Sequence, residues 1–67
     1  MKFRVDFQNN IPASATEIKG ALNHNPDRAE FDIVDGKSVI KCLYLDADNP
    51  ESAMRQAKNI LEKIFHF

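Results

Sequence analysis

Apolar and polar residues alternate at the start of the chain. Phe3, Val5 and Phe7 occupy every second position, and charged or amide side chains separate them. A two-residue period is typical of a strand with one buried face and one solvated face. We therefore expect a strand over residues 2–8 with its phenylalanines and valine pointing inward.

The pattern changes after this strand and predicts a short helix. Residues 9–12 interrupt the alternation, and Ser14 with Glu17 three positions later has the spacing of a capping box. Gly20 disfavours a helix by about 1 kcal/mol relative to alanine, and residues 23–26 end it. We expect roughly two turns, packed through the apolar positions Ala15, Ile18, Ala21 and Leu22.

A β-hairpin is predicted around Asp35-Gly36. This pair readily adopts the positive φ that a two-residue hairpin loop needs. Counting outward from the loop gives a register with these pairs: Val34 with Lys37, Asp32 with Val39, Phe31 with Ile40, Glu30 with Lys41, and Ala29 with Cys42. In this register apolar residues meet on one face and opposite charges meet on the other, an agreement that a one-residue slip would destroy.

The second strand of the hairpin, over residues 38–46, is apolar on both faces. The first set, on one face, is Ile40, Cys42 and Tyr44. The second set, on the other face, is Val39, Leu43 and Leu45. Strands that are apolar on both sides usually lie inside a sheet. We expect a central strand with the first set facing the helices and the second set on the open face.

A second helix is predicted from Pro50 to the end of the chain. Asn49 is a good N-cap, and proline suits the first helical position. One apolar stripe then follows at helical spacing, formed by Ala53, Met54, Ala57, Ile60, Leu61, Ile64 and Phe65.

These elements predict a single α+β domain over residues 1–67. A right-handed crossover would make the first two strands parallel and place the third strand between them, giving a three-stranded sheet in the order 1-3-2. Both helices would pack on one face, as in half of a ferredoxin-like fold. The result would leave an edge strand and an apolar sheet face uncovered.

Chain length and composition favour a partner. A single core in a chain of 67 residues seldom contributes more than about 3 to 5 kcal/mol, and small domains usually add a disulfide, a metal or another subunit. Cys42 is the only cysteine, and no cysteines or histidines stand at zinc spacing. We therefore expect no metal or other cofactor, and a homodimer or a larger protein subunit as partner.

Charge and hydropathy argue against a membrane partner and leave nucleic acid only as an indirect partner. Nine basic and ten acidic residues are interspersed and give a net charge of −1, so nothing attracts nucleic acid to the chain as a whole. The N-terminus lacks the apolar core of a signal peptide, and no segment is apolar for the length of a bilayer. We expect a cytoplasmic protein without a membrane partner.

The titratable residues do not form a catalytic motif. His24 and His66 have no carboxylate or nucleophile at a productive spacing, and Cys42 is expected to be buried with a raised pKa. The acidic segment 46–51 lacks the glycine and glutamate of a calcium loop and instead favours the helix dipole that follows it. The chain is therefore not expected to be an enzyme.

Residues 28–64 resemble the small dimerising subunit of the KEOPS complex, which makes threonylcarbamoyl-adenosine in tRNA. The likeness is carried by the β-α-β-β-α order, by the charged hairpin with its glycine turn at residues 30–37, and by Ser52-Ala53-Met54-Arg55 with Asn59 after it. The resemblance implies a non-catalytic subunit that dimerises and docks on the catalytic subunit through Ser52, Arg55 and Asn59.

From these observations we expect a non-enzymatic protein-interaction module that acts as a dimerising scaffold subunit, in the KEOPS complex if the resemblance is homology. Its expected interaction residues are Val39, Leu43, Leu45, Ser52, Arg55, Asn59, Phe65 and Phe67. One alternative is a nucleic-acid-binding module that uses Lys2, Arg4, Lys19, Lys37 and Lys41. Another is a small inhibitor protein of unknown target.

Overall fold

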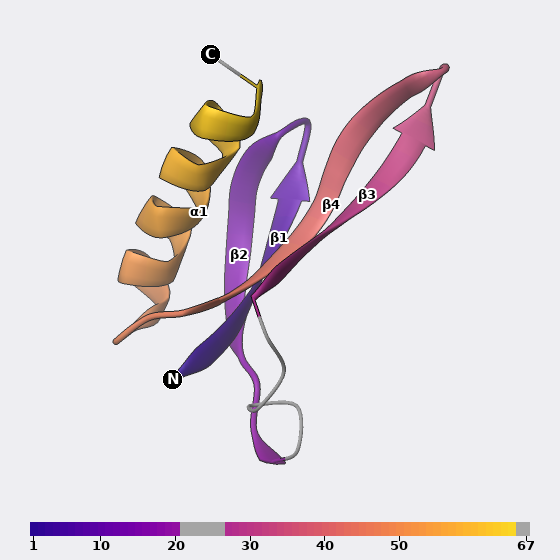
Figure 1. Ribbon diagram of the computed structural model, residues 1–67. Coiled ribbons are helices and arrows are strands. Elements are labelled where there is room, and N and C mark those ends of the chain that lie inside the picture. The colour runs from indigo at the N-terminus through magenta and orange to yellow at the C-terminus, as the bar shows by residue number, and fades with distance from the viewer. Residues whose placement is uncertain (21–26, 66–67) are drawn as a thin grey trace.

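Four strands and one helix make up the fold. The computed structural model describes residues 1–20 and 27–65. Its elements are β1 (Lys2–Gln8), β2 (Ile11–Glu17), β3 (Arg28–Val34), β4 (Lys37–Asp46) and α1 (Pro50–Phe65). The strands form one antiparallel sheet in the order β2-β1-β4-β3, and α1 covers one face of it (Figure 1).

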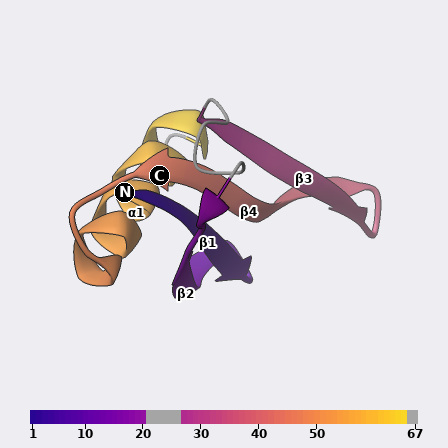
Figure 2. The same ribbon diagram turned by 90° about the horizontal axis from the view of Figure 1, so that it is seen from below.

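The helix is displaced toward the β2 side of the sheet. It packs chiefly against β2, with smaller contacts to β1 and β4. In the view from below, α1 lies at one side of the sheet and the tip of the β3–β4 hairpin lies at the other side (Figure 2). The outer half of that hairpin therefore extends away from the helix.

The predicted fold class, a three-stranded sheet with two helices, is wrong. The segment expected to be the first helix forms β2 and pairs with β1 along the strand, from Phe3 with Glu17 to Gln8 with Ile11. The expectation that β4 lies between β1 and β3, antiparallel to both, agrees with the observed sheet. The expected helical positions 21 and 22 and the helix end at 23–26 lie outside the described residues.

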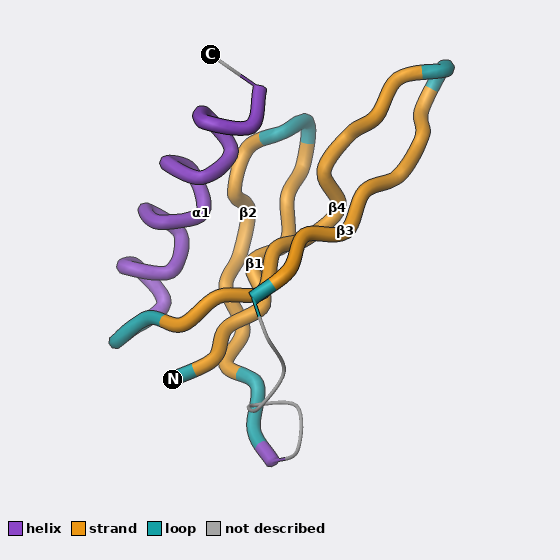
Figure 3. Tube along the Cα trace, viewed as in Figure 1, coloured by secondary structure: helices purple, strands orange, loops and turns teal. Residues whose placement is uncertain are grey.

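The turn at Asn9-Asn10 explains why this segment is a strand. Both asparagines adopt positive φ, 54° and 61°, which is the geometry of the favoured two-residue hairpin loop (Figure 3). Asparagine tolerates this conformation better than other non-glycine residues. A helix of two turns containing Gly20 is marginal on its own, whereas β2 gains a ladder of hydrogen bonds with β1.

The β3–β4 hairpin follows the predicted register only near its turn. Asp35 and Gly36 form the loop with φ of 53° and 77°, and pairing runs as expected as far as Phe31 with Ile40. Beyond that point Glu30 pairs with Cys42 instead of Lys41, so β4 bulges by one residue. The bulge at Lys41 inverts the alternation of side chains along β4.

The bulge changes which residues of β4 reach the core. Ile40 joins Leu43 and Leu45 on the face that α1 covers, although strict alternation would separate them. Pairing of β4 with β1 ends at Cys42, and the backbone N–H of Ile40 donates to Asn10 Oδ1 at 3.2 Å. The β1–β2 turn thereby supplies an acceptor where the ladder stops.

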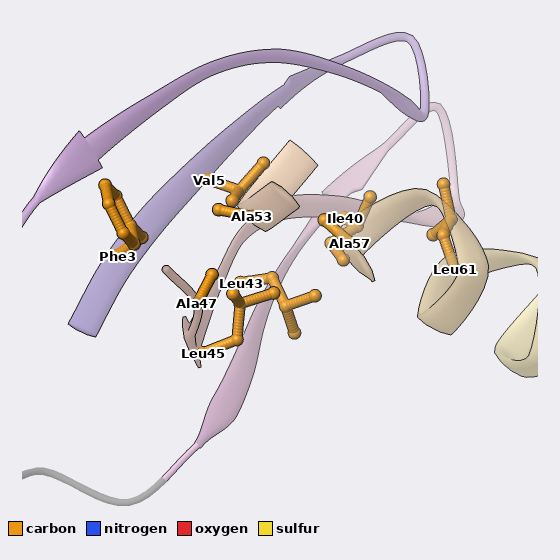
Figure 4. Close-up of a cluster of buried hydrophobic side chains, with 9 residues drawn as sticks. All are labelled: Phe3, Val5, Ile40, Leu43, Leu45, Ala47, Ala53, Ala57 and Leu61. Atoms are coloured by element: carbon orange, nitrogen blue, oxygen red, sulfur yellow. The ribbon is translucent and has the colours of Figure 1, made fainter. Parts of the chain in front are cut away.

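The core lies between α1 and the centre of the sheet (Figure 4). Its nine buried members are Phe3, Val5, Ile40, Leu43, Leu45, Ala47, Ala53, Ala57 and Leu61. Ala53 and Ala57 are fully buried, and their small side chains allow α1 to lie close to the strands. The predicted start of the helix is confirmed, since α1 begins at Pro50 and Asn49 Oδ1 accepts a hydrogen bond from the Ser52 N–H at 2.8 Å.

The contribution of the β1–β2 turn is testable with two substitutions. We expect Asn10→Ala to lower the free energy of unfolding by about 1 to 3 kcal/mol, because alanine disfavours positive φ and Ile40 loses its acceptor. Asn9→Gly is the control, because glycine adopts positive φ freely and the hydrogen bond remains. Urea unfolding measures both, and an Asn10→Ala variant as stable as the parent would contradict this role.

Candidate interaction surface

The outer part of the β3–β4 hairpin forms a two-stranded arm. The β1–β4 ladder ends at Cys42, so residues 37–40 of β4 are paired with β3 alone. We call residues 31–40 the hairpin arm. A two-stranded hairpin is marginally stable by itself in water, so this arm depends on the sheet at its base or on a partner at its tip.

The hairpin arm exposes large apolar side chains. The exposed fraction is 78% for Ile33, 51% for Val34 and 46% for Phe31. Because the bulge lies in β4, side chains alternate without interruption along β3, which places Phe31 and Ile33 on the same face as the buried Ile40. The apolar face of the sheet therefore continues along the arm beyond the core.

The two edges of the sheet differ in their capacity to pair with another strand. On β2, Pro12 lacks an N–H and Ala13 has no opposite residue on β1, and the strand also packs against α1. Proline, bulges and a covering helix are common means of protecting an edge. β3 contains no proline and no bulge of its own, so the β3 edge is the one suited to pairing.

Two hollows flank these elements. One, of about 330 Å³, lies between the end of β1 and the hairpin arm and is lined by Phe7, Asp32, Val34 and Val39, among others. The other, of about 360 Å³, lies between the β1–β2 turn and α1, and its lining includes the apolar Pro12, Met54 and Leu61 and the charged Arg55, Lys58 and Glu62. The first hollow makes the underside of the arm a recess rather than a flat surface.

The predicted open-face position of Leu43 and Leu45 is wrong. Their side chains are 5% and 2% exposed and pack in the core. The cause is the position of α1, which covers the face of Phe3, Val5, Leu43 and Leu45 and leaves the face of Cys42 and Tyr44 open. Val39, the third member of that predicted set, lies within the arm opposite Asp32, so it is on the open face, where it is half-buried.

The remaining predicted interaction residues belong to α1 or follow it in the sequence, and none of them is part of the hairpin arm. The Ser52 N–H is bound by Asn49 and its Oγ accepts from Gln56 Nε2 at 3.2 Å, which gives Ser52 a role at the helix start. Arg55 and Asn59 are exposed on the helix surface. The side chain of Phe65 and all of Phe67 lie outside the described part of the chain.

Sequence reasoning missed the exposed side chains of the hairpin arm. Alternation alone predicts that Phe31 and Ile33 share one inward face, and they do share one face of β3. Their distance from the core follows from the Asp35-Gly36 turn, which places Ile33 two residues from a hairpin tip. The turn therefore indicates that Ile33 lies near the hairpin tip. It does not indicate that α1 packs chiefly on β2, because that packing depends on tertiary contacts and not on a local sequence pattern.

Opposite charges are paired on the open face of the sheet. Arg4 forms an ion pair with Asp6 at 3.2 Å and Arg28 with Glu30 at 3.3 Å, and Arg28 also stacks 4.7 Å from the centre of the Tyr44 ring. These contacts balance the cations locally. Of the cations named for the nucleic-acid alternative, these contacts occupy Arg4, whereas Lys19, Lys37 and Lys41 take part in none of the ion pairs found among the described residues.

Lys2 is also committed to carboxylates. Its side chain is only 3% exposed and forms ion pairs with Asp27 and, at 3.2 Å, with Asp46. The hydrogen bond to Asp27 raises the pKa of Lys2 above its ordinary value of 10.5, against the opposing effect of burial. Because the pKa is higher in the folded chain, this stabilisation is complete below about pH 10.5 and is lost as the pH rises through the folded-state pKa.

The described part of the chain holds neither a metal-binding cluster nor a membrane-spanning helix. Residues 1–20 and 27–65 contain no group of three His, Cys, Asp or Glu side chains placed to hold a metal ion. Within the same residues, no helix has the length and apolar character needed to cross a membrane. Comparison of the chain with protein-family models, with curated proteins and with solved structures gives no match.

The burial of Leu43 makes a direct prediction for stability. We expect Leu43→Ala to lower the free energy of unfolding by about 2 to 5 kcal/mol, because it removes a buried side chain and leaves a cavity under α1. Ile33→Ala on the exposed arm is the matched control and should change stability by less than about 1 kcal/mol. Thermal unfolding followed by circular dichroism measures both, and equal effects would place Leu43 outside the core.

The environment of Cys42 predicts slow thiol chemistry. Burial, and then the nearby Glu30 carboxylate, raise the pKa of the Cys42 thiol above its ordinary value of 9.0. We expect the folded chain to react with iodoacetamide much more slowly than the urea-unfolded chain, with a rate that still rises above pH 9. Glu30→Gln should shift this pH profile to lower pH, whereas a profile centred at or below pH 8.5 in the parent would contradict the burial.

Proposed function

We propose that the chain is a non-enzymatic protein-interaction module whose binding surface is the hairpin arm. The supporting observation is the exposure of Ile33, Val34 and Phe31 on an arm that extends away from α1. Neighbouring exposed apolar side chains such as Phe31 and Ile33, which share one face of β3, commonly mark sites of protein association. The charged residues Asp32, Asp35 and Lys37 are exposed next to them along the arm, and polar neighbours are typical of such sites.

The small core supports the same proposal. Three of its nine members are alanines, so few large side chains hold α1 on the sheet. A partner that covers the arm would remove further apolar surface from water, at about 25 cal/mol per Å². It would also hold the two strands of the arm together. Binding and folding stability are thus coupled in this proposal.

A scaffold subunit and an inhibitor of another protein would both use this surface, so the proposal covers both roles. The KEOPS resemblance stays a prediction. Its element order is not the order of this fold, because β2 occupies the place of the first helix. What remains of the resemblance is the β3–β4 hairpin with its glycine turn and the start of α1 at residues 50–55.

Substitution at the tip of the arm tests the proposal. We expect Ile33→Lys to reduce partner binding by about tenfold or more, because it puts a charge at the centre of the apolar surface. Ile64→Lys is the matched control, since Ile64 is 43% exposed on α1. Circular dichroism checks that both variants remain folded.

The measurement compares the parent and the two variants as affinity baits under identical conditions. Mass spectrometry quantifies each retained protein, and light scattering over a dilution series detects self-association. A protein, or a second copy of the chain, that binds the parent and Ile64→Lys but not Ile33→Lys supports the proposal. If every bound species is retained equally by Ile33→Lys, the arm is not the binding surface.

A further inference from the structure

We infer that the β3 edge binds an extended segment of a different protein, antiparallel to β3, in which basic and apolar residues alternate. This inference rests on the proposed function and specifies the chemistry of the partner. The binding mode is strand addition, in which main-chain hydrogen bonds supply affinity and alternate side chains supply specificity. Three features of β3 lead to it: its place at the edge, its two distinct faces, and its poor fit to itself.

The first feature is the accessibility of the edge. β3 is the terminal strand of the sheet, and no described strand lies beyond it. It offers a regular run of seven residues, whereas the opposite edge strand, β2, is protected by Pro12, the irregularity at Ala13 and contact with α1. An added strand therefore finds continuous main-chain donors and acceptors on one edge of the sheet.

The second feature is the separation of charge and apolar character on β3. Glu30 and Asp32 lie on the face of Cys42 and Tyr44, and Phe31 and Ile33 lie on the opposite face. An incoming strand places its own side chains directly across from these, on the same faces. Lysine or arginine opposite the acids and aliphatic residues opposite Phe31 and Ile33 would complement both faces at once.

Asp32 is the acid that most needs such a partner. Glu30 already has Arg28 at 3.3 Å, whereas Asp32 takes part in none of the ion pairs found among the described residues. Its cross-strand neighbour is Val39, and it lines the hollow beneath the arm. A basic side chain opposite Asp32 would gain an ion pair without breaking one.

The third feature argues against a second copy of the chain on this edge. If a second copy were related by a two-fold axis perpendicular to the sheet, the two β3 strands would run antiparallel. Residues on the same face of the two strands would then stand opposite one another. The antiparallel register that pairs all seven residues of β3 with those of the copy is centred on Phe31, and it sets Glu30 opposite Asp32 of the copy twice. A parallel, in-register pair also sets each acid beside itself. Like charges directly opposite are destabilising, so the composition of β3 favours a basic heterologous strand.

Three peptide probes test the inference with the full chain. The first alternates lysine with valine, the second alternates glutamate with valine, and the third is the lysine peptide with a central valine replaced by proline. Titration is followed by the amide resonances of the protein, which identify the strand that is contacted. We expect the lysine peptide to perturb residues 28–34 and to bind at least tenfold more tightly than the other two. Its affinity should fall as salt is added.

A charge reversal provides the stricter test. Asp32→Lys should weaken the lysine peptide at least tenfold and strengthen the glutamate peptide. Glu17→Lys makes the same change of charge on β2 and should leave both affinities within about twofold, since it alters net charge but not the β3 edge. Perturbations centred on β2 or α1, or equal binding of lysine and glutamate peptides, would overturn the inference.

The two proposals fail in different ways. If Ile33→Lys abolishes partner capture while Asp32→Lys leaves peptide preference unchanged, the arm binds a partner but not by a basic strand. If light scattering shows a dimer of the parent that Asp32→Lys strengthens, the β3 edge pairs with a second copy and the inference is wrong. If the peptides bind β3 as expected but Ile33→Lys retains all captured proteins, the strand site exists and the proposed function fails.

Discussion

The packing of α1 on β1, β2 and β4 is the interaction on which the rest of the structure depends. Ala53 and Ala57 bring the helix close to the strands, and the large apolar side chains of the core come mainly from the sheet. One helix is too narrow to cover four strands. The sheet is therefore protected on the side of β2 and left uncovered toward the tip of β3 and β4, and the candidate interaction surface lies where the helix does not reach.

The same constraint links stability to function in this fold. The hairpin arm is held at its base by β1 and by the hydrogen bond from Ile40 to Asn10, and beyond that point it has only its own ladder. A two-stranded arm with few other contacts is stabilised most by a ligand that adds hydrogen bonds along its whole length. Strand addition at the β3 edge does this, whereas a contact confined to side chains would leave the ladder unchanged.

Local signals in the sequence account for much of the fold. The Asp35-Gly36 loop, the start of α1 after Asn49 and the alternation in β1 and β3 were each readable, because each depends on a few neighbouring residues. β2 was not, because Ser14, Glu17 and the small residues around them fit a helix start as well as a strand. The positive φ of Asn9 and Asn10 decides between the two, and an Asn-Asn loop between alternating segments was the available signal. The bulge at Lys41 and the position of α1 are tertiary outcomes without a local signature.

The bulge at Lys41 separates the hairpin into two parts that can change independently. Pairing with β1 ends at Cys42, and Ile40 is the last residue of β4 in the core, so the core does not fix how many residues follow toward the turn. Lengthening both strands of the arm by two residues would preserve the faces of every existing side chain and move the loop outward. The reach of the arm is thus a property that insertion and deletion can adjust while the helix and the core remain as they are.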